Sequence, residues 1–144
     1  MVPTLWGRIQ TRIALLATVG FVVTGLITPL LPARGPLGDR YGTTFMVLAT
    51  VAVLGTAWEF LYHFLMQFRW EKDWPTLYGL VTLVPEGALV WILAERGMVP
   101  GLTAPPFAAF GIHFVVTWLS VWLVANSLLR VPYPRWRFHG GRLI

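Results

Sequence analysis

The 144-residue chain contains no cysteine, and only 12% of its residues are charged. Without cysteine there can be no disulfide, thiolate metal site or iron–sulfur cluster. Soluble domains carry about 25% charged residues. The low charge, together with 56% hydrophobic residues, therefore excludes a soluble enzyme, a secreted disulfide-stabilised protein and a disordered chain. The composition predicts an integral membrane protein.

Four long apolar runs organise the sequence, at residues 13–31, 43–68, 76–94 and 107–129. A helix needs about 20 apolar residues to cross a hydrocarbon core of about 30 Å, and each run is near or above that length. An open sheet in lipid would leave backbone groups unpaired, and the runs lack the alternation of barrel strands. We therefore predict an all-α integral membrane protein, a four-transmembrane-helix bundle over residues 13–129 with short loops and no soluble domain.

The distribution of basic residues predicts the orientation. Eight of them lie at the two termini and in the loop between the second and third runs, whereas Arg34, Arg40 and Arg96 lie on the other side. Short cytoplasmic loops carry an excess of Lys and Arg, so both termini are expected in the cytoplasm. Ten Arg against one Lys, with abundant Ala, Gly, Pro, Val and Leu, is typical of a high-GC bacterium. We expect a bacterial cytoplasmic membrane.

Residues 1–12 are predicted to form an amphipathic segment at the membrane interface. Leu5 and Ile9 are spaced for one helical face, and Arg8 and Arg12 lie beside them. This pattern predicts an interfacial anchor that precedes the first transmembrane helix.

Residues 130–144 are predicted to form a basic, aromatic cytoplasmic tail. Two prolines prevent a helix from continuing through this segment. Alternating arginine and aromatic residues suit anionic lipid headgroups, at about 1 kcal/mol per basic residue, and would equally suit the cytoplasmic face of a partner protein. The net charge of +5 is placed at the ends of apolar runs, so we do not predict nucleic-acid binding. The residues expected to dock on headgroups or a partner are Arg130, Arg135, Trp136, Arg137 and Arg142.

Three polar groups within the runs form the main candidate site: Glu59, His63 and Glu86. A charge at the centre of a membrane costs about 2.5–3.5 kcal/mol, so such residues are candidates for function. At about 1.5 Å per residue, Glu59 lies about 13 Å, His63 about 7 Å and Glu86 about 16 Å from the cytoplasmic end of its helix. Glu59 and His63 are spaced to hydrogen-bond on one helical face. Two carboxylates at one level suit a proton relay or a small-cation site, and equally a structural pair.

Further candidates in the membrane are His113, Gln67 and Asn126. His63 and His113 differ by about 17 Å in depth, so they cannot both ligate one haem iron. A haem with one histidine from this chain, or a quinone, stays open, and the cofactor is otherwise unknown. We predict no metal site, because the depths of Glu59, His63 and Glu86 differ by up to about 9 Å. The loops and tail carry no nucleophile–base–acid set, so no catalytic residue is named and an enzyme is not favoured.

Three functions fit these features. Small or polar residues recur every four positions in the second run and form a polar ridge: Gly55, Glu59, His63 and Gln67. The favoured hypothesis is an accessory or assembly subunit of a larger membrane complex, or a homo-oligomer, because this polar ridge needs a partner. The alternative is a proton-coupled small-solute or ion transporter that uses Glu59, His63 and Glu86. The second alternative is a redox subunit that binds haem or a quinone.

Overall fold

The computed structural model describes residues 3–71, 75–133, 136 and 138–144. Four helices within this part are long and apolar enough to cross a membrane, at Leu5–Leu30, Leu37–Met66, Thr76–Glu95 and Phe107–Arg130. The prediction of an all-helical bundle with four membrane spans is confirmed. In chain order the elements are α1 (Leu5–Leu15), η1 (Leu16–Gly20), α2 (Phe21–Ile27), η2 (Thr28–Leu30), α3 (Leu37–Met66), α4 (Thr76–Val81), α5 (Leu83–Glu95), α6 (Phe107–Asn126) and η3 (Leu128–Arg130).

The first span begins earlier than its apolar run. Thr4 caps α1, since its hydroxyl accepts a hydrogen bond from the backbone N–H of Gly7 at 3.1 Å. Helix therefore begins at Leu5 and continues through Ile13, so the segment predicted as an interfacial anchor is helical and continuous with the first span. η1 is a π-helical turn inside this span, and η2 closes the span with a 3-10 turn.

The second span also begins before its apolar run, at Leu37 instead of residue 43. Pro36 stands at the start of α3, and Asp39 in its first turn opposes the positive end of the helix dipole. Arg40 of the same turn donates hydrogen bonds to the carbonyls of Thr28, Pro29 and Leu31. It thereby satisfies the free carbonyls where the first span ends, which holds the connection between the two spans tightly.

The third span is interrupted between α4 and α5. Pro85 has no backbone N–H to donate to Val81, and the helix breaks at Thr82. Pro85 therefore accounts for the interruption of the helix in this span. It places Glu86 in the first turn of α5, where its own N–H bonds to the carbonyl of Thr82 at 3.2 Å.

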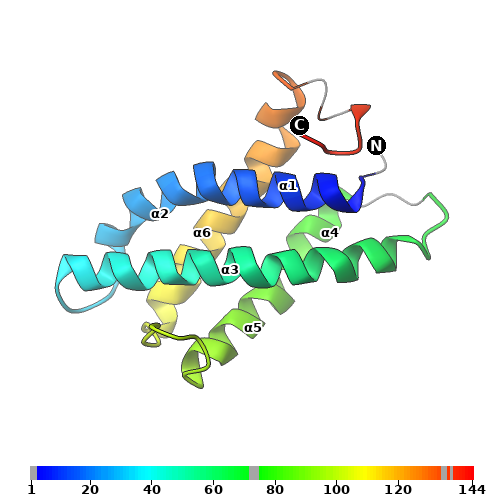
Figure 1. Ribbon diagram of the computed structural model, residues 1–144. Coiled ribbons are helices and arrows are strands. Elements are labelled where there is room, and N and C mark those ends of the chain that lie inside the picture. The colour runs from blue at the N-terminus through cyan, green and yellow to red at the C-terminus, as the bar shows by residue number, and fades with distance from the viewer. Residues whose placement is uncertain (1–2, 72–74, 134–135, 137) are drawn as a thin grey trace.

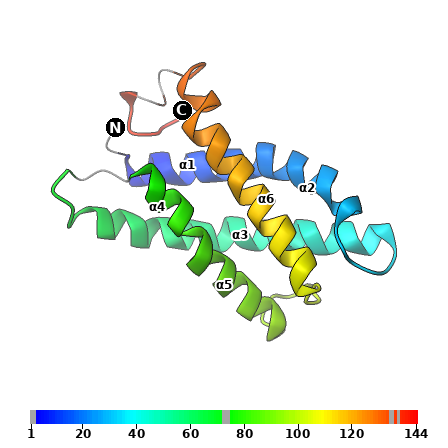
Figure 2. The ribbon, with the colours of Figure 1, turned by 180° about the vertical axis from the view of Figure 1, so that it is seen from behind.

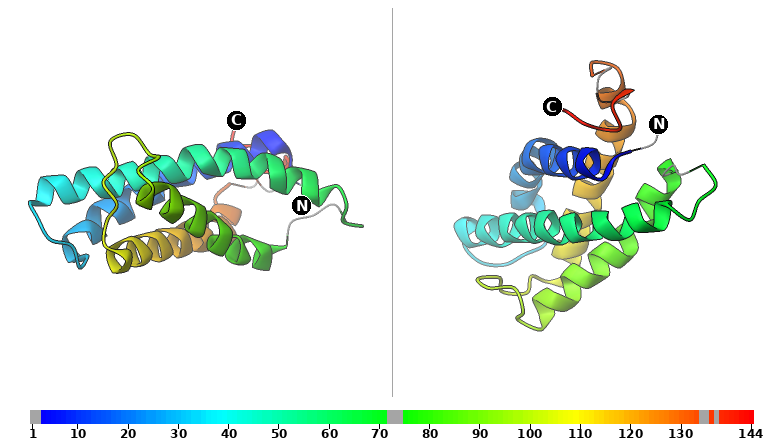
Figure 3. Two further views of the ribbon diagram at one scale, coloured as in Figure 1. Left: turned by 90° about the horizontal axis from the view of Figure 1, so that it is seen from below. Right: turned by 45° about the vertical axis from the view of Figure 1, so that its right-hand side comes forward.

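The spans form two layers. The α1–α2 span and α3 run antiparallel in one layer, and the α4–α5 span and α6 cross them in the other (Figures 1, 2 and 3). Apolar side chains fill the space between the layers, namely Leu16, Val47, Leu48, Val51, Val90, Ala94, Leu102, Phe110 and Phe114. Both described chain ends lie at the same end of the bundle as the turn that follows α3 (Figure 1), which we call the terminal end. The connections after η2 and after α5 lie at the opposite end, the loop end.

Candidate functional site

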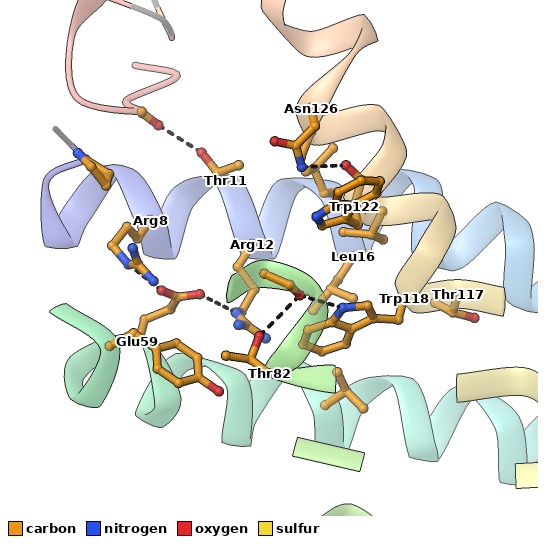
Figure 4. A pocket seen from close by; sticks show the side chains of 18 of the residues that line it. Arg8, Thr11, Arg12, Leu16, Glu59, Thr82, Thr117, Trp118, Trp122 and Asn126 are labelled. Atoms are coloured by element: carbon orange, nitrogen blue, oxygen red, sulfur yellow. Dashed lines mark hydrogen bonds and ion pairs between the residues drawn. The ribbon is translucent and has the colours of Figure 1, made fainter. Parts of the chain in front are cut away.

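A cluster of two arginines and two glutamates lies buried between the layers. On α1, Arg8 Nε is 2.6 Å from Glu59 Oε2, and Arg12 Nε is 2.7 Å from Glu59 Oε1 (Figure 4). Both terminal nitrogens of Arg12 also donate hydrogen bonds to the Glu86 carboxylate, at 2.8 and 3.1 Å. The Tyr62 hydroxyl donates to Glu86 Oε1 at 2.8 Å. One arginine thus connects three helices, α1, α3 and α5.

Helical spacing and a glycine make this arrangement fit. Arg8 and Arg12 are four residues apart, so both side chains leave α1 on one face, toward α3. Gly55 lies one turn before Glu59 on α3. A Cβ atom at Gly55 would lie 2.5 Å from Arg12 Nη1 and 2.8 Å from its Cδ. The missing side chain therefore provides the space through which Arg12 reaches the two carboxylates.

The formal charges of the cluster sum to zero, and its members are well shielded. The side chains of Glu86, Glu59, Arg8 and Arg12 are 2, 8, 9 and 13% exposed. Burying such charges costs free energy unless each charge is compensated by a close ion pair and hydrogen bonds. The bidentate contact of Arg12 with Glu86 is the strongest geometry for an arginine–carboxylate pair. Arg12 Cζ also lies 5.7 Å from the ring centroid of Trp118. The two arginines and two glutamates are thus paired with one another.

A cavity of about 260 Å³ opens beside the cluster toward the terminal end. We call it the terminal-end cavity. Arg8, Arg12 and Glu59 form one wall, and the indoles of Trp118 and Trp122 on α6 face them (Figure 4). Each indole N–H donates to a backbone carbonyl of α4, on Gly79 and Thr76, which fixes the aromatic wall.

A second cavity, of about 360 Å³, lies at the loop end. We call it the loop-end cavity. Its lining is more polar and includes Arg34, Asp39 and Arg40. Val47 and His113 line both cavities, so these two side chains lie where the cavities adjoin. We refer to Val47 and His113 as the partition.

Buried hydrogen bonds hold the partition and the wall of the loop-end cavity. His113 Nε2 lies 2.9 Å from the Thr24 hydroxyl, and both residues are almost fully buried. One turn further along the first span, the Thr28 hydroxyl lies 2.8 Å from that of Thr44. The loop-end half of the bundle thus has a polar interior built from threonines and one imidazole, in contrast to its apolar surroundings.

The predicted site residues are only partly brought together. Glu59 and Glu86 meet through Arg12. His63 does not join them: in the described part of the chain its buried Nδ1 has no hydrogen-bond partner, while Glu59 pairs with the two arginines. His63 lines neither of the two cavities. Gln67 donates to the His63 carbonyl on its own helix.

Other predicted residues that the structure describes lie away from the charge cluster, at the rim of the terminal-end cavity or on the outer surface. Asn126 donates to the carbonyl of Trp122 and accepts from Arg130, and both Asn126 and Arg130 line the terminal-end cavity. Arg142 is exposed, as a contact with headgroups or a partner requires. Arg135 and Arg137 lie outside the described residues.

Trp136 is buried, and the described part of the tail packs on α1. The Trp136 indole N–H donates to the Thr11 hydroxyl at 2.8 Å, and that hydroxyl donates to the Gly141 carbonyl at 2.9 Å. A Cβ atom at Gly7 would lie 2.2 Å from the Gly140 carbonyl oxygen, so only glycine permits this contact. Trp136 and Gly141 border the terminal-end cavity, and the tail therefore forms part of its rim.

Sequence reasoning missed Arg8 and Arg12 as members of the site. Their charges were assigned to the membrane interface, where they contribute to orientation. The four-residue spacing of the two arginines and the need of Glu59 and Glu86 for positive partners at a similar depth were the signals that could have found them. Tyr62, one turn from Glu59, was missed because a tyrosine on an apolar helix has no distinguishing pattern.

Comparisons with known proteins assign neither a family nor a function to the chain. No protein-family model, curated protein or solved structure matches the chain. Within the described residues, no group of three or more His, Asp or Glu side chains is placed to hold a metal ion. The haem and quinone alternatives stay predictions, and function is inferred from the geometry of the cluster and the cavities.

Proposed function

We propose that the protein is a small ion transporter that moves protons between the terminal-end and loop-end cavities. The observation that carries the proposal is the partition, because His113 borders both cavities. An imidazole can accept a proton on one ring nitrogen and release one from the other. Protonatable groups also line or adjoin the path on both sides, with Glu59 and Tyr62 at the terminal-end cavity and Asp39 at the loop-end cavity.

The charge cluster supports this function as the entrance to the path. Arg12 pairs with both Glu59 and Glu86, so a proton that binds Glu86 removes one of the two charges that hold the guanidinium. In this scheme His113 takes the place that the sequence pattern assigned to His63.

The cluster also bears on the accessory-subunit hypothesis. A partner was expected because the polar ridge of the second span could not face lipid. Glu59, at the centre of that ridge, finds Arg8 and Arg12 within the same chain. That reason for a partner is therefore met internally. The hypothesis stays a prediction, and stoichiometric companions that co-purify in mild detergent would support it.

Proton flux into liposomes tests the proposal. Purified protein is reconstituted into vesicles loaded with pyranine, and a potassium gradient with valinomycin drives proton entry. We expect wild-type protein to acidify the lumen faster than protein-free vesicles, and His113→Gln to lose at least nine-tenths of that excess rate. Glutamine keeps a group that can hydrogen-bond to Thr24 but cannot carry a proton. His63→Gln is the matched control, because His63 lines neither cavity, and it should conduct normally.

Two results would contradict the proposal. Wild-type vesicles that acidify no faster than protein-free vesicles would remove proton movement altogether. Full flux through His113→Gln, or equal losses in His113→Gln and His63→Gln, would remove the partition as its path.

A further inference from the structure

The terminal-end cavity contains a buried hydroxyl that the proton path does not use. Thr117 on α6 lines the cavity and is 5% exposed. In the described part of the chain its Oγ1 has no hydrogen-bond partner. A threonine within a helix commonly donates to the carbonyl four residues before it, as Thr50 and Thr56 do here. A buried hydroxyl without a partner costs free energy, and a ligand with one polar group would satisfy it.

The walls around this hydroxyl favour an aromatic ring. Trp118 and Trp122 contribute indole surfaces, and Leu16, Val51 and Val121 contribute aliphatic ones. An engineered apolar cavity of about 150 Å³ is enough to bind benzene. A cavity of about 260 Å³ therefore has room for one six-membered ring with a small substituent.

The charge cluster determines the charge of the ligand. Arg8 and Arg12 balance Glu59 and Glu86, and each carboxylate is held at ion-pair distance by an arginine. A charged molecule entering this low-dielectric space would have to be desolvated and would disturb pairs that are already balanced. An uncharged molecule avoids both costs.

We propose that the terminal-end cavity binds an uncharged six-membered aromatic or quinonoid ring that bears an oxygen substituent, with that oxygen hydrogen-bonded to Thr117 and the ring beside Trp118. The site goes beyond proton movement and does not depend on it. A soluble phenol-like molecule and the headgroup of a membrane quinone share this chemistry.

Calorimetric titration of the purified protein in detergent, against a detergent blank, tests the site. The neutral probe is benzyl alcohol, and benzoate and benzylamine are its negatively and positively charged counterparts. We expect saturable binding of benzyl alcohol and at least tenfold weaker binding of both charged probes. A tail-less benzoquinone is titrated in parallel: tighter binding than benzyl alcohol identifies a quinone headgroup, and weaker binding identifies a phenol-like molecule.

Variants locate the binding. Thr117→Val, which removes the hydroxyl at nearly constant volume, should weaken benzyl alcohol about threefold to tenfold, the loss expected for one hydrogen bond. Thr117→Ser should restore the affinity. Ala125→Trp, which fills the cavity from α6, should abolish binding. Thr50→Val on α3, which does not line the cavity, should leave it unchanged. Three results would overturn the proposal. The first is wild-type affinity in Thr117→Val or Ala125→Trp. The others are binding of benzoate or benzylamine as tight as that of benzyl alcohol, and no saturable binding of either neutral probe. Proton flux is measured separately, so failure of one proposal leaves the other standing.

Discussion

Replacement of Arg12 by methionine is the most informative perturbation of the buried cluster. Methionine keeps an unbranched chain of similar length in the space beside Gly55 but removes the charge and its hydrogen bonds. Glu86 then keeps the Tyr62 hydroxyl but loses the guanidinium of Arg12, and Glu59 keeps Arg8. The cluster changes from neutral to a net charge of −1, with the excess charge on Glu86, whose side chain is 2% exposed.

The expected loss of stability follows from this uncompensated charge. Removing one partner of a buried ion pair typically costs about 3–5 kcal/mol, because the remaining charge is left desolvated. For a chain of this size each kcal/mol shifts the thermal midpoint by about 2–4 °C, so Arg12→Met should unfold about 6–20 °C below wild type. Thermal unfolding in one detergent, followed by intrinsic fluorescence, measures the shift.

A second substitution distinguishes charge from packing. Arg12→Met combined with Glu86→Gln restores a neutral cluster, in which Arg8 pairs with Glu59 and the glutamine still accepts from Tyr62. We expect the double variant to recover at least half of the loss. Arg96→Met, at an exposed arginine after α5, is the matched control and should change stability by no more than about 0.5 kcal/mol.

An Arg12→Met variant no less stable than Arg96→Met would show that the buried charge of Arg12 does not stabilise the bundle. A double variant as unstable as the sum of its single substitutions would show that packing rather than charge explains the effect.

Three further predictions concern the rest of the bundle. Gly7→Ala should cost about 1–3 kcal/mol and make the tail cleavable by protease, because its Cβ would meet the Gly140 carbonyl oxygen at 2.2 Å. Thr24→Val should cost about 1–3 kcal/mol, measured by thermal unfolding, because it leaves the buried His113 Nε2 without its partner. Arg34→Cys, which introduces the only cysteine, should react with an impermeant maleimide added to intact cells, because the loop end is predicted to face outward.

Each of these predictions has a control on the same chain. Gly25→Ala meets nothing within 4 Å and lies in helix, so it should stabilise by about 0.5–1 kcal/mol. Thr50→Val removes a half-buried hydroxyl that bonds only to the Met46 carbonyl of its own helix in the described residues, and it should be nearly neutral. Glu71→Cys at the terminal end should react only after the cells are permeabilised. The first prediction is contradicted if the tail of Gly7→Ala resists protease, and the second if Thr24→Val is as stable as wild type. The third is contradicted if Glu71→Cys reacts in intact cells and Arg34→Cys reacts only after permeabilisation.

The membrane spans could be predicted from the sequence because hydropathy and length alone decide which helices can cross lipid. The ends of the spans could not be predicted as well. Helix begins at Leu5 because Thr4 provides a cap, and at Leu37 because Asp39 and Arg40 stabilise that turn through the helix dipole and the carbonyls of the preceding span. These are polar contacts outside the apolar runs, so hydropathy is insensitive to them.

The candidate site was predictable to a similar degree. Depth along straight helices placed Glu59 and Glu86 at one level, and Arg12 indeed bridges them. The direction in which each side chain points around its helix could not be predicted as well from the sequence. The four-residue repeat grouped His63 with Glu59, but α1 packs against α3 and its arginines occupy the carboxylate. Likewise His113 looked solitary because Thr24, its partner, belongs to a span 89 positions away in sequence.

The burial of Arg8 and Arg12 also affects the argument for orientation. Both were counted among the eight basic residues of the predicted cytoplasmic side, yet their charges are neutralised inside the bundle. Without them six basic residues remain on that side, against three on the other. Arg40 on the opposite side is engaged with backbone carbonyls rather than water. The positive-inside bias of the sequence therefore persists without the N-terminal arginines, and it then depends on the basic residues of the tail and of the segment after α3.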